Sequence, residues 1–81
     1  MAPEITIRQA TSDDAFALRR LALLDDRAAL HGNVLLAEQA GEVRAAVSLE
    51  DGRSIANPFA PTAALVQMLR THSRQVETVA A

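Results

Sequence analysis

The chain has 81 residues, with eight basic residues (all arginine) against ten acidic ones and a formal net charge of −2. This length corresponds to one small domain, residues 1–81. Scattered positive charge and few aromatic side chains argue against a nucleic-acid partner, and no apolar run is long enough for a membrane span. Residues 1–4 show no secretory signal pattern, so we expect a cytoplasmic protein.

The apolar residues predict a thin core. Of the 40 apolar residues, 17 are alanine, and the chain has no cysteine for a disulfide bond. A domain of this size buries only about 60% of the surface of its unfolded chain. The composition therefore favours further burial against a protein partner, most simply a second copy in a homodimer.

The first predicted elements are a strand and a helix. Residues 4–8 alternate between apolar and polar side chains, which predicts a short strand. The hydroxyl and carboxylate side chains of residues 11–14 predict a helix start, and the helix should run to residues 24–26. Its predicted core face consists of Ala17, Leu18, Leu21, Leu24 and Ala28. Phe16 and Leu23 lie on a different face, either as ordinary exposed side chains or as a contact patch.

Three further strands should form a meander. Residues 34–38 are apolar at nearly every position, which indicates a strand covered on both faces. Residues 43–49 alternate, which predicts a half-buried strand after a turn at Ala40-Gly41. The pair Asp51-Gly52 predicts a type I′ turn that returns residues 53–56 to the preceding strand.

A connector and a second helix complete the predicted order, β-α-β-β-β-α, which is an α+β fold with a small, mostly antiparallel sheet. The connector, residues 57–61, contains two prolines. The helix should begin at Thr62 and be amphipathic. Its apolar stripe consists of Leu65, Met68, Leu69, His72, Val76 and Val79.

No motif in the chain announces a catalytic or metal site. His72 falls on the apolar stripe, which favours a packed or interface histidine, and His31 lies in a glycine turn without a partner visible in the sequence. The adjacent carboxylates at residues 13–14 and 25–26 would point about 100° apart on a helix, which indicates capping rather than a catalytic dyad. We therefore expect no catalytic, cofactor-binding or metal-binding residues.

Two segments resemble the GNAT acetyltransferase superfamily. Residues 5–15, ITIRQATSDDA, are similar to its opening pattern hIRxATxxDA, which forms the first strand and the cap of the first helix. Residues 34–49, VLLAEQAGEVRAAVSL, resemble its second and third strands. The resemblance covers about the first 50 residues and implies the fold of the N-terminal half of a GNAT domain.

The same resemblance locates what the chain lacks. In the superfamily, a loop Q/R-x-x-G-x-G/A at a helix N-terminus holds the acetyl-CoA pyrophosphate through free amides. The corresponding residues 57–63, NPFAPTA, contain no glycine and no arginine, and Pro58 and Pro61 each lack an amide hydrogen. The 81 residues also hold no counterpart of the fifth strand and no tyrosine to act as an acid. The resemblance therefore implies a fold and transfers no functional residue.

These observations predict a non-catalytic, GNAT-like protein that acts as an interaction or regulatory module, without a cofactor. The unpaired edge of the strand at residues 53–56 would suit a homodimer. One alternative is an acyl-CoA-dependent N-acetyltransferase completed by oligomerisation, with acetyl-CoA as its cofactor, and another is an unrelated small α+β subunit of a larger complex. The expected interface residues are Ile55, Phe59, Leu65, Met68, Leu69, His72 and Val76.

Overall fold

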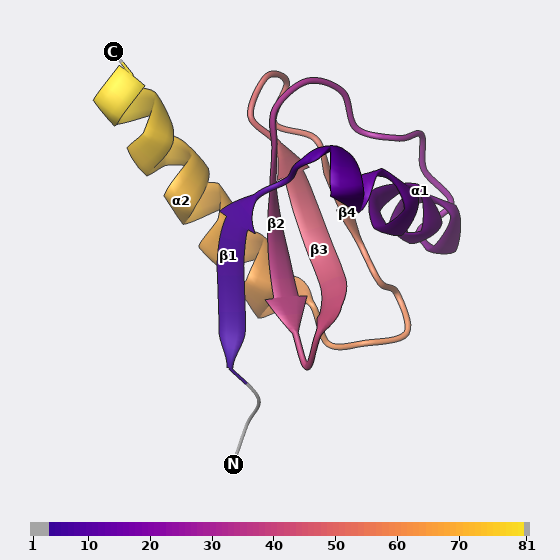
Figure 1. The fold of residues 1–81 in the computed structure, drawn as a ribbon. Coiled ribbons are helices and arrows are strands. Elements are labelled where there is room, and N and C mark those ends of the chain that lie inside the picture. The colour runs from indigo at the N-terminus through magenta and orange to yellow at the C-terminus, as the bar shows by residue number, and fades with distance from the viewer. Residues whose placement is uncertain (1–3, 81) are drawn as a thin grey trace.

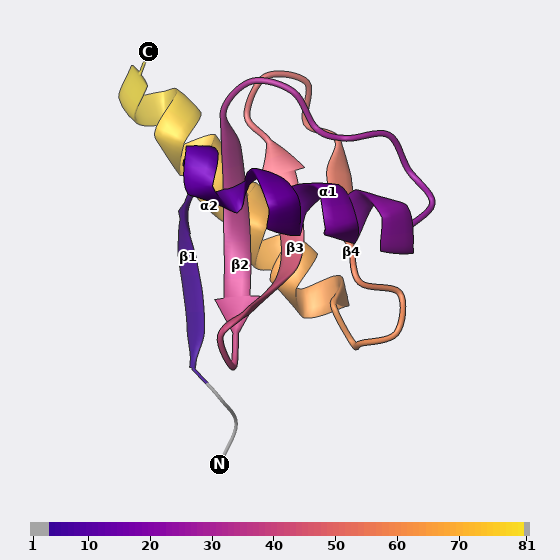
Figure 2. The same cartoon turned by 45° about the vertical axis from the view of Figure 1, so that its right-hand side comes forward.

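The computed structural model describes residues 4–80, with side chains as far as residue 75, as a four-stranded sheet with a helix on each face (Figures 1 and 2). The strand order is β1-β2-β3-β4, and every neighbouring pair is antiparallel. The α+β class and the predicted element order are both confirmed. The elements are β1 (Ile5–Gln9), η1 (Ser12–Asp14), α1 (Ala15–Leu24), β2 (Val34–Gln39), β3 (Glu42–Ser48), β4 (Ser54–Ala56) and α2 (Ala63–Ala80).

Two apolar clusters, one on each face of the sheet, form the core. The cluster under α1 contains Leu21, Ala22, Val34, Leu36, Ala46 and Ile55. The cluster under α2 contains Leu35, Ala37, Ala45, Val47, Leu65 and Leu69. Strands β2 and β3 contribute alternate side chains to both clusters, since successive residues of a strand point to opposite faces. The two central strands therefore hold the three layers together.

The burial of β2 is confirmed, whereas that of β3 differs from the prediction. Val34, Leu35, Leu36 and Ala37 are all buried, as expected of a strand covered on both faces. Strand β3 is not half-buried: both of its faces are covered from Ala45 to Ser48. The alternation placed Ala46 and Ser48 on the exposed face of this strand. In the structure Ala46 lies beneath α1, and the buried Ser48 hydroxyl donates to the His31 carbonyl.

A β-bulge changes which face the start of β3 presents. The pairing runs Ala37↔Ala45 and then Glu38↔Val43, so Arg44 is the extra residue opposite this step. Val43 consequently packs against the α1 cluster, whereas Ala45 lies in the α2 cluster. Strict alternation would have placed these two side chains on the same face.

Helix α1 ends where predicted but uses a narrower face for the core. Leu21 and Ala22 are buried, whereas Leu24 is 38% exposed and Ala28 lies outside the helix, exposed to solvent. The helix terminates because Asp26 adopts a φ of 52°, and the Arg27 amide donates to the Ala22 carbonyl at 2.9 Å. This is the bonding of a Schellman motif, in which glycine is the usual left-handed residue.

The type I′ geometry occurs in the first hairpin turn rather than in the second, where it was predicted. The turn between β2 and β3 has positive φ at both central residues, 55° at Ala40 and 78° at Gly41, as a type I′ turn requires. Between β3 and β4, among the turn residues only Gly52 has a positive φ, and its amide donates to the Ser48 carbonyl at 3.0 Å. The predicted hairpin at Asp51-Gly52 forms, but the predicted type I′ turn at that position was wrong because the loop is longer than two residues.

The turn at Ala40 provides a test by stability. A non-glycine residue at this φ carries a cost of about 1 kcal/mol, and asparagine tolerates the conformation better than alanine. We expect Ala40→Asn to raise the free energy of unfolding by about 0.5–1 kcal/mol. The matched change Gly41→Ala should lower it by about 1–2 kcal/mol, since a Cβ there meets nothing within 4 Å and only the φ of 78° opposes it. Urea titrations of both variants measure the effects, and equal midpoints for all three proteins would contradict the assignment.

Candidate functional site

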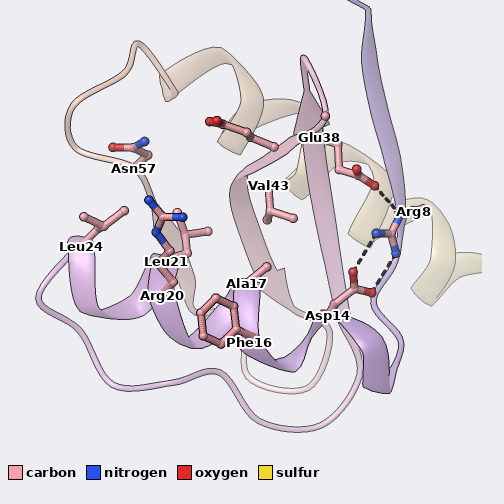
Figure 3. Close-up of a pocket in the computed structure, with 12 residues that line it drawn as sticks. Arg8, Asp14, Phe16, Ala17, Arg20, Leu21, Leu24, Glu38, Val43 and Asn57 are labelled. Carbon is pink, nitrogen blue, oxygen red and sulfur yellow. Dashed lines mark hydrogen bonds and ion pairs between the residues drawn. The ribbon is translucent and has the colours of Figure 1, made fainter.

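A groove with a volume of about 340 Å³ lies between α1 and the β2–β3 hairpin (Figure 3). Its apolar wall includes Ala17 and Leu21 of α1 and Val43 of β3, while Arg20 and Asn57 line it with polar groups. The side chain of Phe16 lines the same groove and is 79% exposed. Phe16 and Leu23 are both exposed, as the sequence predicted, and so belong to the surface of α1 rather than to its core.

An ion network between β1, β2 and the start of α1 also lines the groove. Arg8 donates from both terminal nitrogens to the Asp14 carboxylate, at 2.8 Å each, and from Nε to Glu38 (Figure 3). Asp14 also accepts the Thr11 amide at 2.7 Å, the return bond of a helix-capping box. The network joins the edge strand to the helix above the sheet.

Arg8 and Asp14 hold each other in their ionised forms. The hydrogen bonds from Arg8, and to a smaller extent the one from the Thr11 amide, hold the pKa of the Asp14 carboxyl well below its usual range. Asp14 and then Glu38 raise the pKa of the Arg8 guanidinium. A carboxylate already occupied by a bidentate guanidinium and a backbone amide is a poor proton acceptor, so the network orients chain segments rather than serving as a general base.

Acid should therefore weaken the fold through Asp14. A carboxyl whose folded pKa is depressed stabilises the native state above its unfolded value, about 4, and this contribution is lost as the pH falls below it. We expect the urea midpoint to decline below about pH 4, and the decline to be shallower in Asp14→Asn, which cannot titrate. The control is Asp13→Asn, since Asp13 is exposed and lies next to Asp14. This variant should show the same decline of the urea midpoint with falling pH as the wild type. Identical slopes in wild type and Asp14→Asn would exclude this role.

The connector between β4 and α2 offers no amide to an anion. Of the three amide hydrogens in residues 57–61, that of Asn57 donates to the Arg44 carbonyl at 2.9 Å. The Phe59 amide donates to the Asn57 side chain at 2.9 Å, and the Ala60 amide donates to the Asn57 carbonyl at 3.3 Å. Pro58 and Pro61 have none. Every amide of this segment is thus absent or already bonded within the chain.

The structure divides the expected interface residues between core and surface. Ile55, Leu65 and Leu69 are buried in the chain's own two clusters. Phe59 is 82% exposed and Met68 is 37% exposed. Of the expected interface residues whose side chains are described, these two are the apolar ones that lie on the surface. His72 is exposed, with Nδ1 3.0 Å from the Met68 carbonyl, and the side chain of Val76 lies outside the described part.

Neither histidine is among the residues that line the groove. His31 is an exposed loop residue whose carbonyl accepts the Ser48 hydroxyl at 3.0 Å. Among the residues described, no three histidine, cysteine or acidic side chains are grouped as a metal would require. The same part of the chain contains no helix both long enough and apolar enough to cross a bilayer.

The expected open edge at β4 is short and partly covered. The Ser48 amide donates to the Arg53 carbonyl and the Asn57 amide to the Arg44 carbonyl, so the backbone groups of Ser54 and Ala56 face away from β3. The Ala56 amide donates to the Asp25 carboxylate at 3.0 Å. The loop after α1 therefore occupies part of the edge that the sequence had suggested for a second strand.

The sequence did not reveal the Arg8 network or the role of Ser48. Arg8 and Glu38 stand thirty residues apart, and only the strand register brings them together. Ser48 is fully buried, and its hydroxyl also accepts the Glu50 amide at 3.2 Å. The one local signal was the spacing of Thr11 and Asp14, which is that of a capping box.

No protein-family description, curated protein sequence or solved structure matches this chain.

Proposed function

We propose that the chain is a non-catalytic protein-interaction module that resembles the N-terminal half of a GNAT domain and associates with a second copy of itself. The support for this relationship is the succession of motifs in residues 5–49 together with the antiparallel order β1-β2-β3-β4 and a helix on each face. Of the carboxylates that line the groove, Asp14 and Glu38 are both bonded to Arg8, which supports a structural role for them. As part of the same proposal, we assign it to the cytoplasm.

The connector carries the non-catalytic assignment. An enzyme that uses acetyl-CoA needs several free amides beside a helix N-terminus to hold the pyrophosphate. Asn57 bonds the amides of Phe59 and Ala60, and two prolines remove two more donors. Only the first turn of α2 remains, and it lacks the flanking glycines that would let a pyrophosphate approach.

Two other functions remain as alternatives. An acyltransferase completed by oligomerisation would bind acetyl-CoA only when the chains associate. An unrelated α+β subunit of a larger complex would remain monomeric alone and bind neither acetyl-CoA nor itself. These expectations separate the three candidates without knowledge of a substrate or partner.

We expect acetyl-CoA to bind with a dissociation constant weaker than about 10 μM, which corresponds to less than roughly 7 kcal/mol. Isothermal titration calorimetry of acetyl-CoA into the protein measures the affinity, and native mass spectrometry of the same sample reports the number of chains. A dimer without acetyl-CoA supports the interaction module. Tight binding of acetyl-CoA by the dimer would favour the acyltransferase, and a monomer that binds nothing would favour the unrelated subunit.

A further inference from the structure

The longer open edge of the sheet is β1, not β4. The Ala10 amide donates to the Val34 carbonyl at 2.8 Å, and antiparallel bonds alternate, so the backbone groups of Ile5, Ile7 and Gln9 face away from β2. Within the described residues, these outward groups make no backbone hydrogen bond, and only the Gln9 carbonyl accepts a side chain, Nη1 of Arg8 at 3.4 Å. In the part of the chain that the structure describes, three amides and two carbonyls are therefore unbonded along one five-residue strand, and the Gln9 carbonyl keeps a second lone pair for another donor.

Features that normally protect an edge strand lie elsewhere in the sheet. Edge strands are often shielded by a bulge, by lysine or proline, or by a covering loop. Here the bulge lies between β2 and β3, and the covering carboxylate of Asp25 lies against β4. Strand β1 itself contains no bulge, lysine or proline, and its arginine is turned inward to Asp14 and Glu38.

We propose that β1 is the self-association edge, where it pairs antiparallel with β1 of a second copy about a two-fold axis at Ile7. This inference rests on the proposed function and names its interface. In this register Ile7 faces Ile7 of the second copy, and Ile5 faces Gln9. All six outward backbone groups of each chain then find partners, which gives six interchain hydrogen bonds.

The side chains are compatible with this register. Ile7 packs against the α2 cluster, so Ile5, Ile7 and Gln9 of both copies would share the α2 face. Thr6 and Arg8 would face each other on the α1 face, so no like charges are directly opposite. Ile5, which is 37% exposed, would lose exposed apolar surface beside Gln9.

Helix α2 also extends toward this side. In both views its C-terminal end lies beyond β1, past the edge of the sheet (Figures 1 and 2). A two-fold axis perpendicular to the sheet keeps the α2 faces of both copies on the same side. The projecting ends of the two α2 helices would therefore lie on one face of the dimer.

Proline substitutions at outward-facing positions test the edge without removing a backbone hydrogen bond of the monomer. Each change removes one side-chain hydrogen bond, from Gln9 Nε2 to Asn33 at 3.3 Å or from Arg70 to the Ser54 hydroxyl at 3.2 Å, so the two variants are matched in this respect. Gln9→Pro deletes an outward amide of β1, and Ser54→Pro is the matched change on β4. At about 50 μM, sedimentation equilibrium should give twice the 8.7 kDa chain mass for wild type and Ser54→Pro, and the single-chain mass for Gln9→Pro. Circular dichroism and urea midpoints check that both variants fold, and Ile5→Lys offers a second edge change that keeps every backbone amide.

Cysteine pairs test the register directly, because the chain contains no cysteine of its own. Opposed residues of a hydrogen-bonded pair are about 5.5 Å apart at Cα, which a disulfide can span. Ile5→Cys combined with Gln9→Cys should give a covalent dimer under mild oxidation, whereas Ile5→Cys alone should not. Residues 5 and 9 of one chain are too far apart along a strand to bond each other.

The outcomes separate this inference from the function on which it rests. A monomeric wild type would overturn both self-association and the β1 edge. A dimer that survives Gln9→Pro and Ile5→Lys, or that dissociates only with Ser54→Pro, would overturn the β1 edge and leave the interaction module intact. Efficient cross-linking by Ile5→Cys alone would overturn the register centred on Ile7.

Discussion

Leu69→Arg should unfold the chain rather than merely alter a surface. Leu69 is 0% exposed and lies in the α2 cluster against the central strands. A buried guanidinium without a partner costs about 3–5 kcal/mol, which is comparable to the roughly 4–12 kcal/mol expected for a domain of this length. The expected result is loss of the cooperative thermal transition and of most helical circular dichroism at 25 °C.

Met68→Arg is the matched control, since the neighbouring side chain on the same helix is 37% exposed. Its free energy of unfolding should change by less than about 0.5 kcal/mol. A Leu69→Arg protein that is folded but monomeric would contradict this prediction. That result would support the earlier expectation that Leu69 is an interface residue. The expected interface residues Ile55 and Leu65 fall under the same argument, because they too are buried within the chain's own core.

Ala46→Leu should destabilise the protein by overfilling the space beneath α1. Ala46 is 0% exposed and lies in the cluster with Leu21 and Ala22, where its methyl group permits close approach of helix and sheet. Extra methylene groups in a packed core force neighbouring side chains from their rotamers, at a cost of about 1–3 kcal/mol. Urea unfolding should show a lower midpoint with an unchanged m-value.

Ala64→Leu provides the control for this change, because Ala64 is exposed at the start of α2. Leucine and alanine are both good helix formers, so the free energy of unfolding should shift by less than about 0.5 kcal/mol. A midpoint for Ala46→Leu equal to or above that of wild type would mean that unused space remains under α1. The alanine-rich composition would then describe a loose core rather than a thin, tightly packed one.

The candidate site was less predictable than the fold. The connector could be recognised from Pro58 and Pro61 because a missing amide is a property of the residue itself. The bonds that Asn57 makes to the Phe59 and Ala60 amides became visible only in the folded loop. The groove likewise depends on how far α1 lies from the β2–β3 hairpin, which no residue type specifies.

The sequence by itself determined the element order, the positions of the turns at Ala40-Gly41 and Asp51-Gly52, and the burial of β2, because side-chain period and glycine conformation act over a few neighbouring residues. The tertiary structure decided the burial of β3, since the bulge at Arg44 and the approach of both helices are long-range effects. It also decided which edge is open. The carboxylate of Asp25 reaches the Ala56 amide thirty-one residues later, and only packing of α1 against the sheet brings the two together.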